Sequence, residues 1–279
     1  MKSDIRMVNF TTRLEQAVEL SNSLLSVGLD PGYAKLPHSV ADQFEFNKAI
    51  IDATHDLVSV YKPNPAFYEA RGAVGVAALK QTCDYIKSNH PHIQILVDAK
   101  RGDIGNTNAG YVEYVFDYLG ADAVTVAPYM GSESLGAFLE RSDKGIIVLC
   151  RTSNPGSGEF QDLDVDGEKL FMHVARQVVH KWNQLGNVML MVGATYPQEL
   201  AAVRKIAGPD MPILVAGVGA QGGDLAQTMA AGLGAHGRGL IVSASRSVIF
   251  ASAASDFAAA ARAEANRLRD AINLYRGKD

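Results

Sequence analysis

Cysteine is scarce in this sequence, with only two residues, Cys83 and Cys150, in 279 positions. Two thiols cannot form the disulfide framework that stabilises small secreted domains. Cys83 falls in a stretch with a helical pattern and Cys150 in an apolar run, so both patterns predict buried, unreactive thiols. A disulfide scaffold is therefore excluded.

Long apolar runs are also missing. No stretch reaches the roughly 18 to 20 apolar residues that a membrane-spanning helix needs. The N-terminal residues MKSDIRMVNF carry charges where a signal peptide has an apolar centre. We therefore expect a cytoplasmic protein that does not enter a membrane.

Neither sign of charge dominates. Lys and Arg total 26 and Asp and Glu total 30, which gives a formal net charge of −4. This balance lacks the basic excess typical of DNA- or RNA-binding proteins, so we expect no nucleic acid partner. A small anionic substrate remains compatible with it, because a phosphate site needs only a few local donors.

What the chain does contain is a series of short apolar runs that alternate with helical patterns. The runs are nearly continuous in hydrophobicity, which is typical of parallel strands buried on both faces. They cover residues 24–29, 57–61, 93–97, 123–127, 145–149, 188–192, 213–216 and 239–243. Helical patterns cover residues 42–56, 75–89, 107–119, 168–184, 197–206 and 255–275. Eight runs in a chain of this length predict an α/β fold, a single (β/α)8 TIM barrel domain over residues 1–279.

The barrel prediction also says where a site should lie. In such barrels the active site is at the C-terminal ends of the strands. Polar residues follow the predicted strands at Asp30, Lys62, Asp98, Lys100, Asp103, Arg151, Ser153, Gln221, Ser245 and Arg246. A long polar segment, residues 152–167, follows the fifth run and predicts a functional loop. The sequence therefore predicts a charged site at one rim of the barrel.

Two lysines and two aspartates form the first group of candidate residues. Asp98 and Lys100 are two positions apart, so in an extended strand their side chains point to the same face. Lys62 ends the neighbouring strand, and Asp103 follows shortly after Lys100. An alternating Lys–Asp–Lys–Asp array can keep every group charged, because each opposite neighbour offsets the cost of desolvation. The alternative is a salt-bridge network that only stabilises the barrel.

A glycine-rich segment, residues 215–224, follows the seventh run. It matches G-x-G-x-x-G, but the acidic residue that a dinucleotide site needs about 20 positions later is missing. In barrels, the loops after the seventh and eighth strands commonly bind phosphate through backbone N–H groups. Gln221 can add a donor, and Arg246 can bind two phosphate oxygens at once. We therefore predict a phosphate site at these two loops.

Metal and cofactor chemistry is not expected. His90 and His92 form a close pair, but they precede the third run, at the end of the barrel that carries no catalytic residues. The other histidines are scattered, and no Gly-x-Ser-x-Gly motif indicates acyl transfer. We predict an enzyme that uses neither a metal nor a cofactor.

Residues 98–107, DAKRGDIGNT, resemble the D-x-K-x-x-D signature of orotidine 5′-phosphate decarboxylases, in the form of the longer bacterial branch of that family. Further matches follow in family order: GLDP at 28–31, KPNPAF at 62–67, TSNPG at 152–156, GVGAQGGD at 217–224 and SR at 245–246. The resemblance implies decarboxylation of orotidine 5′-phosphate to UMP, the last step of de novo UMP biosynthesis.

The resemblance implies a catalytic array that needs no cofactor. Its members would be Lys62, Asp98, Lys100 and Asp103, placed beside C6 of the pyrimidine. Lys100 would protonate C6 after CO2 leaves. Asp103 would reach across the interface of a homodimer, so that the two subunits share their active sites.

The resemblance also implies the substrate contacts. These would be Asp30 to the ribose, Ser153 to the pyrimidine edge, Gln221 and Arg246 to the phosphate, and Ile104 and Thr107 from the partner subunit. The chain departs from the family at Ser245, because many relatives have glycine before the phosphate-binding arginine.

Three alternatives compete with this interpretation. A Mg2+-dependent phosphosugar decarboxylase or aldolase of the same barrel group would need an extra acidic ligand beside the second strand, where this chain has YKPNP at 61–65. A Schiff-base aldolase would need an unprotonated Lys62 or Lys100, which flanking aspartates disfavour. A barrel that serves only as a scaffold is disfavoured by the intact charged rim.

Overall fold

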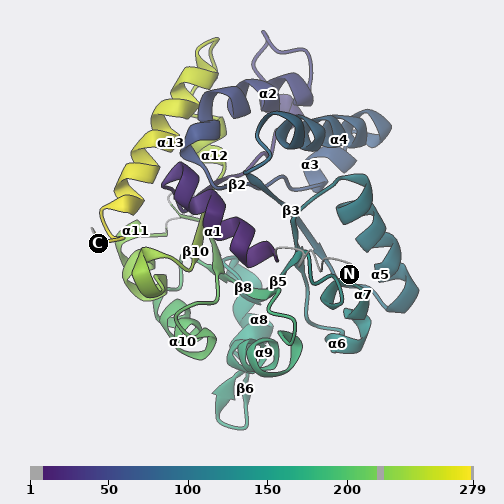
Figure 1. The fold of residues 1–279 in the computed structure, drawn as a ribbon, viewed down its shortest axis with the longest axis vertical. Helices are drawn as coiled ribbons and strands as arrows, with labels where there is room; N and C mark the ends of the chain where they lie inside the picture. Colours follow the sequence, from purple (N-terminus) through teal and green to yellow (C-terminus); the bar gives the residue numbers. More distant parts are fainter. Residues whose placement is uncertain (1–8, 219–222, 278–279) are drawn as a thin grey trace, which may run out of the picture.

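Eight parallel strands close into a barrel in the computed structural model, which describes residues 9–218 and 223–277 (Figure 1). The strands are β1 Leu25–Val27, β2 Val60–Tyr61, β3 Gln94–Arg101, β4 Ala123–Val126, β5 Gly145–Arg151, β8 Val188–Gly193, β9 Ile213–Ala216 and β10 Leu240–Ala244. Each overlaps one of the eight predicted runs, and the prediction of a (β/α)8 barrel is confirmed. The strands are almost entirely buried because helices cover them outside and side chains fill the barrel inside.

Helices form the outer layer around the barrel (Figure 1). They are α2 Gln43–Thr54, α3 Ala66–Glu69, α4 Gly72–Asn89, α5 Gly105–Val112, α6 Gly131–Ser134, α7 Gly136–Leu139, α8 Gly158–Gln161, α9 Leu170–Gln177, α10 Pro197–Ala207, α11 Leu225–Gly232, α12 Arg246–Ile249 and α13 Phe257–Asn273. Two begin at aspartate caps: Asp42 accepts from Glu45 N, and Asp224 accepts from Gln227 N. No helix in the described part of the chain is long and apolar enough to cross a membrane.

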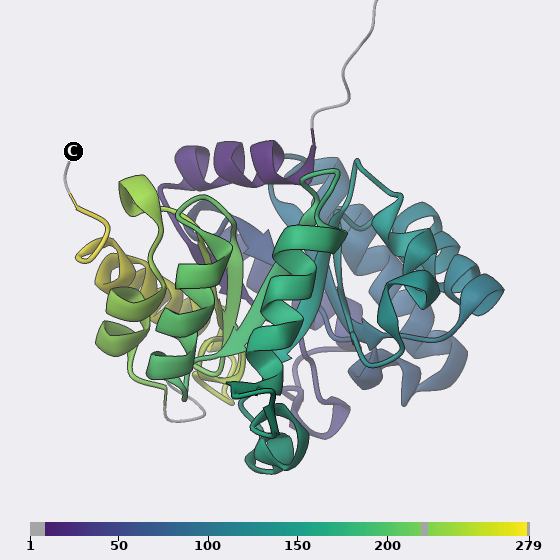
Figure 2. The same ribbon diagram turned by 90° about the horizontal axis from the view of Figure 1, so that it is seen from below.

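An N-terminal helix that the sequence patterns did not predict, α1 Phe10–Ser21, covers one end of the barrel (Figure 2). Phe10 packs against the start of β5, where a Cβ on Gly145 would lie 2.5 Å from its ring. Arg13 Nη2 donates to the backbone oxygen of Asp143 at 3.0 Å. The helix therefore closes the N-terminal ends of the strands and leaves the opposite end available for a site.

The segment after β5 is more ordered than a simple loop. It contains a 3-10 turn, Pro155–Ser157, then α8 and a small antiparallel hairpin of β6 Asp164–Val165 and β7 Glu168–Lys169. In Figure 2 this segment projects from the end of the barrel opposite α1. The helix predicted from residue 168 instead begins at Leu170, because the two preceding residues pair with β6.

Both cysteines are buried, as their sequence context predicts. Cys83 lies in α4 and Cys150 in β5. Burial raises the pKa of each thiol to about 12, so neither exists as the reactive thiolate near neutral pH. Both are structural residues of the barrel.

Candidate active site

A cavity of about 600 Å³ opens at the C-terminal ends of the barrel strands. Seven of the rim residues that the sequence predicted line it together: Asp30, Lys62, Asp98, Lys100, Ser153, Ser245 and Arg246. They come from loops or strand ends of β1, β2, β3, β5 and β10. Parallel strands bring these sequence-distant residues to one rim, as the barrel prediction requires.

The centre of the cavity is a Lys–Asp–Lys ion pair network. Lys62 Nζ lies 3.2 Å from Asp98 Oδ2, and Lys100 Nζ lies 2.7 Å from Asp98 Oδ1. The side chains of Lys62 and Asp98 are buried, whereas 41% of the Lys100 side chain is exposed. Lys100 is therefore the cation of the network that can meet a bound molecule.

The charges of this network stabilise one another. Burial alone would raise the pKa of Asp98, but Lys62, Lys100 and the hydroxyl of Thr125 together hold that pKa well below its usual range. Burial alone would lower the pKa of Lys62, but the carboxylates of Asp98 and Asp30 outweigh it and raise the pKa. Asp98 and Lys62 therefore stay charged across the physiological pH range.

The backbone at Lys100 departs from the expected extended strand. Its φ is +49°, in the left-handed region, and the pairing of β3 with β4 changes register between Val97 and Arg101. Such a conformation costs a residue with a side chain about 1 to 2 kcal/mol. The predicted meeting of Asp98 and Lys100 therefore occurs, but the expected reason, simple strand alternation, is wrong.

Thr125 of β4 is a site residue that the sequence analysis missed. Its hydroxyl donates to Asp98 Oδ1 at 2.8 Å and accepts from the backbone N–H of Lys100 at 2.9 Å. The sequence gives only a weak indication of this role, because Thr125 is a single polar residue in the apolar run of residues 123–127. A threonine in such a run is usually part of a strand without a special role.

Asp30 is fixed at the rim by two donors. Ser245 Oγ donates to Asp30 Oδ2 at 2.6 Å, and the backbone N–H of Asn64 donates to Asp30 Oδ1 at 3.1 Å. A Cβ on Gly28, the residue directly after β1, would lie 2.6 Å from Ser245 Cβ. Only glycine at this position therefore lets Ser245 come so close. Ser245, the departure from the family pattern, thus uses its side chain to hold Asp30.

The loop that carries Ser153 packs closely over the end of β8. A Cβ on Gly193 would lie 2.7 Å from Ser153 Cβ, so only glycine allows this approach. Thr152, Asn154 and Gln161 of the same loop also line the cavity. Gln161, which the sequence analysis did not select, fixes the loop by accepting from Thr152 N at 2.8 Å.

Arg151 does not line the cavity, although its position at a strand end predicted a rim residue. Its side chain is buried inside the loop after β5, not in the cavity lining. It donates to Thr152 O at 2.9 Å and to Asp162 Oδ2 at 2.9 Å, and its guanidinium lies 3.8 Å from the centre of the Tyr196 ring. Arg151 therefore joins the loops after β5 and β8 and shapes the wall that bears Ser153.

The predicted phosphate site is described in part. Arg246 begins α12, is exposed and lines the cavity, together with Gly217 and Val218 from the end of β9. Gly217 has a φ of +94°, a conformation that favours glycine. Gln221 lies outside the described residues.

The three residues predicted to serve a partner subunit do not line this chain's cavity. Asp103 Oδ1 accepts from its neighbour Ile104 N at 2.7 Å, and no ion pair among the described residues joins Asp103 to Lys62 or Lys100. Ile104 is 55% exposed, and Thr107 is exposed as well. Their predicted role requires a second chain and stays a prediction.

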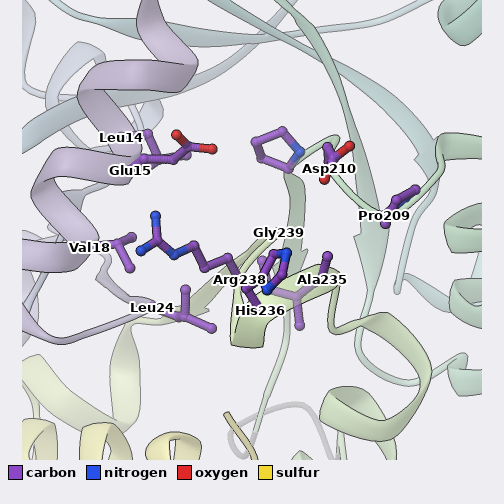
Figure 3. A pocket seen from close by; sticks show the side chains of 12 residues that line it. Leu14, Glu15, Val18, Leu24, Pro209, Asp210, Ala235, His236, Arg238 and Gly239 are labelled. Carbon is purple, nitrogen blue, oxygen red and sulfur yellow. The ribbon is translucent and has the colours of Figure 1, made fainter. Parts of the chain in front are cut away.

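A second cavity, of about 370 Å³, lies at the opposite end of the barrel (Figure 3). Figure 3 shows Glu15 of α1 and Asp210 on opposite sides of it. Leu24, directly before β1, and Leu240, the first residue of β10, form part of its apolar wall. Because this is the N-terminal end of the strands, it is not where a barrel places its chemistry.

Comparisons with known proteins show which family this chain resembles. Residues 23–263 match the orotidine 5′-phosphate decarboxylase / HUMPS family. The chain is 49% identical over 273 residues to the orotidine 5′-phosphate decarboxylase of Azoarcus sp. strain BH72, covering 96% of this chain and 100% of that protein. It is 50% identical over 276 residues to the enzyme of the same name from Thermomicrobium roseum, with 96% of each covered. The solved structure of Leishmania donovani OMP decarboxylase superimposes with a TM-score of 0.84 at 40% identity, covering 96% of this chain and 99% of that one.

Proposed function

The chain belongs to the orotidine 5′-phosphate decarboxylase / HUMPS family, and from that premise we propose that it converts orotidine 5′-phosphate to UMP and CO2 without a metal or cofactor. The observation that carries the proposal is the buried Lys62–Asp98 pair that presents the Lys100 ammonium to the cavity. A fixed cation is what the reaction needs where charge develops. The product would complete UMP biosynthesis.

The proposed complex has the substrate in one orientation. The pyrimidine would lie over the Lys–Asp–Lys network, with Ser153 at its edge and the ribose hydroxyls at Asp30. The phosphate would lie at Arg246 and the loop that contains Gln221. Binding energy from the phosphate end can then stabilise the geometry at the reacting carbon.

The chemistry breaks one carbon–carbon bond and forms one carbon–hydrogen bond. The bond between C6 and its carboxylate breaks, CO2 leaves, and the electron pair remains on C6. The Lys100 ammonium stabilises that pair and transfers a proton to C6, after which solvent returns a proton to the amine. Asp98 stays a carboxylate throughout and, with Lys62, holds Lys100 in place.

The Mg2+-dependent alternative fits the residues poorly. Asp98, the most buried carboxylate of the cavity, already accepts from two ammonium groups, Lys62 and Lys100. Both oxygens of that carboxylate are therefore already paired with a cation of the protein. The network therefore favours electrostatic catalysis by lysine over metal-assisted enolisation.

The function is tested by following the loss of orotidine 5′-phosphate absorbance with purified protein in EDTA. We expect turnover that is unchanged by the chelator, because the proposed site uses only its own charges. Turnover that appears only after Mg2+ is restored would contradict the metal-free mechanism. Absence of turnover in both conditions would contradict the substrate assignment.

A homodimer with shared sites is part of the proposal. Asp103 and Ile104 lie on the β3–α5 loop, and Thr107 lies in the first turn of α5. Ile104 and Thr107 are exposed and Asp103 is half-buried, so all three could enter a neighbouring cavity. Large exposed apolar side chains, Tyr129 and Met130, follow β4. Exposed apolar groups of this size are typical of an interface.

Replacing Arg246 with alanine is expected to lower kcat/KM by about 100- to 10,000-fold, the value of one bidentate charge-assisted contact to phosphate. Added phosphite dianion should restore part of the lost activity. Arg262, which pairs with Asp56 on the outer surface, provides the control, because Arg262→Ala should leave kcat/KM unchanged. An unchanged kcat/KM in Arg246→Ala would contradict the phosphate role.

A further inference from the structure

Thr125 links the backbone and the side chain of Lys100 through a closed ring of hydrogen bonds. The Lys100 N–H donates to Thr125 Oγ1 at 2.9 Å, and that hydroxyl donates to Asp98 Oδ1 at 2.8 Å. The same carboxylate oxygen accepts from Lys100 Nζ at 2.7 Å. Both ends of the lysine are therefore tied to one buried hydroxyl and carboxylate.

The hydroxyl of Thr125 uses its proton for Asp98 and accepts from the backbone of Lys100. Thr125 is fully buried, so no solvent can replace its partners. A hydroxyl has one proton, and donating it to a carboxylate turns its lone pairs toward the Lys100 N–H. The branched Cβ of threonine restricts χ1, which further fixes the direction of the oxygen.

The ring of hydrogen bonds holds the backbone of Lys100 in an unfavourable conformation. Lys100 has a left-handed φ of +49°, a conformation that residues with a side chain adopt only when their surroundings hold them. The hydrogen bond from its N–H to Thr125 is a contact across strands at this point, where β3 and β4 change register. Losing it would free the peptide and move the start of the Lys100 side chain.

We propose that Thr125 is a positioning residue for the proton transfer, holding the Lys100 ammonium at the reacting carbon through this ring. The inference rests on the proposed function, because it assumes that Lys100 protonates C6. It concerns only the reactive geometry and not substrate affinity, since Thr125 does not line the cavity. The effect should therefore fall on kcat and leave KM almost unchanged.

The test compares three variants in decarboxylation and in the exchange of the C6 hydrogen of UMP for deuterium in D2O. Thr125→Val keeps the shape but removes the hydroxyl, and Thr125→Ser keeps the hydroxyl. Thr228→Val is the matched control, because Thr228 is also buried but its hydroxyl has no partner among the described residues. Exchange runs the protonation step in reverse, so it reports on Lys100 independently of CO2 loss.

We expect Thr125→Val to lower kcat by about 10- to 100-fold, the effect of misplacing a catalytic group slightly, with a similar loss in the exchange rate. Thr125→Ser and Thr228→Val should retain both rates within about threefold, since neither loses a hydrogen bond of the ring. Melting temperatures of all variants, and a crystal structure of Thr125→Val, separate misplacement from unfolding.

Two results would overturn the inference. One is full kcat and full exchange in a folded Thr125→Val protein. The other is an equal loss in Thr125→Ser, which keeps the hydroxyl and would show that the hydroxyl does not account for the effect. In either case wild-type turnover of orotidine 5′-phosphate would still stand, whereas absence of turnover in the wild type would remove the proposed function itself.

Discussion

Replacing Lys100 with alanine is expected to lower kcat by about four orders of magnitude or more, because the variant loses both a proton donor and a fixed positive charge at C6. The protein should still fold. Lys62 continues to pair with Asp98, and the lost side chain is 41% exposed, so no buried charge is left alone. Stopped-flow or single-turnover absorbance with excess enzyme would measure the residual rate.

A second lysine separates this effect from a general loss of positive charge. Lys48 forms a surface ion pair with Asp52 on α2, and Lys48→Ala should keep full activity. Surface pairs of this kind contribute little to stability, so that control should also melt normally. A Lys100→Ala variant with kcat within tenfold of the wild type would show that another group protonates C6.

Mixing two inactive variants, Asp103→Ala and Lys100→Ala, is expected to restore activity if the subunits share their sites. Half of the randomly formed dimers would be hybrids, and each hybrid would have one site with both residues intact. About a quarter of the wild-type activity should therefore return. The measurement is the specific activity after the two proteins are mixed at equal concentration and allowed to exchange subunits.

The same experiment can fail in an informative way. If Asp103 served the cavity of its own chain, every site in a hybrid would lack one essential residue, and no activity would return. Cross-linked parent dimers that cannot exchange provide the control and should stay inactive after mixing. The placement of Asp103 away from its own chain's Lys62 and Lys100 favours the first outcome.

The sequence by itself determined the barrel and the position of its site. A strand that is buried on both faces must be apolar throughout, so each strand was visible as a short local run. The polar residues that end those runs, such as Lys62 and Asp98, had to meet at one rim once the strands were parallel. The motif at residues 98–107 indicated which reaction the site carries out.

Only the tertiary structure decided where several of those polar side chains point. Arg151 also lies at the end of a strand, but its guanidinium turns into the following loop and onto Tyr196. Lys100 meets Asp98 through a left-handed backbone held by Thr125, a residue whose apolar surroundings concealed it. The sequence pattern likewise did not predict that α1 covers one end of the barrel.

The physical reason is the range over which each interaction acts. A buried strand must consist of apolar residues, so the hydrophobicity of the sequence shows where the strand lies and where it ends. The direction of a polar side chain depends on partners that lie far away in sequence, as Ser245 does from Asp30. Those hydrogen bonds exist only after the barrel has closed, and they decide which rim residues face the cavity.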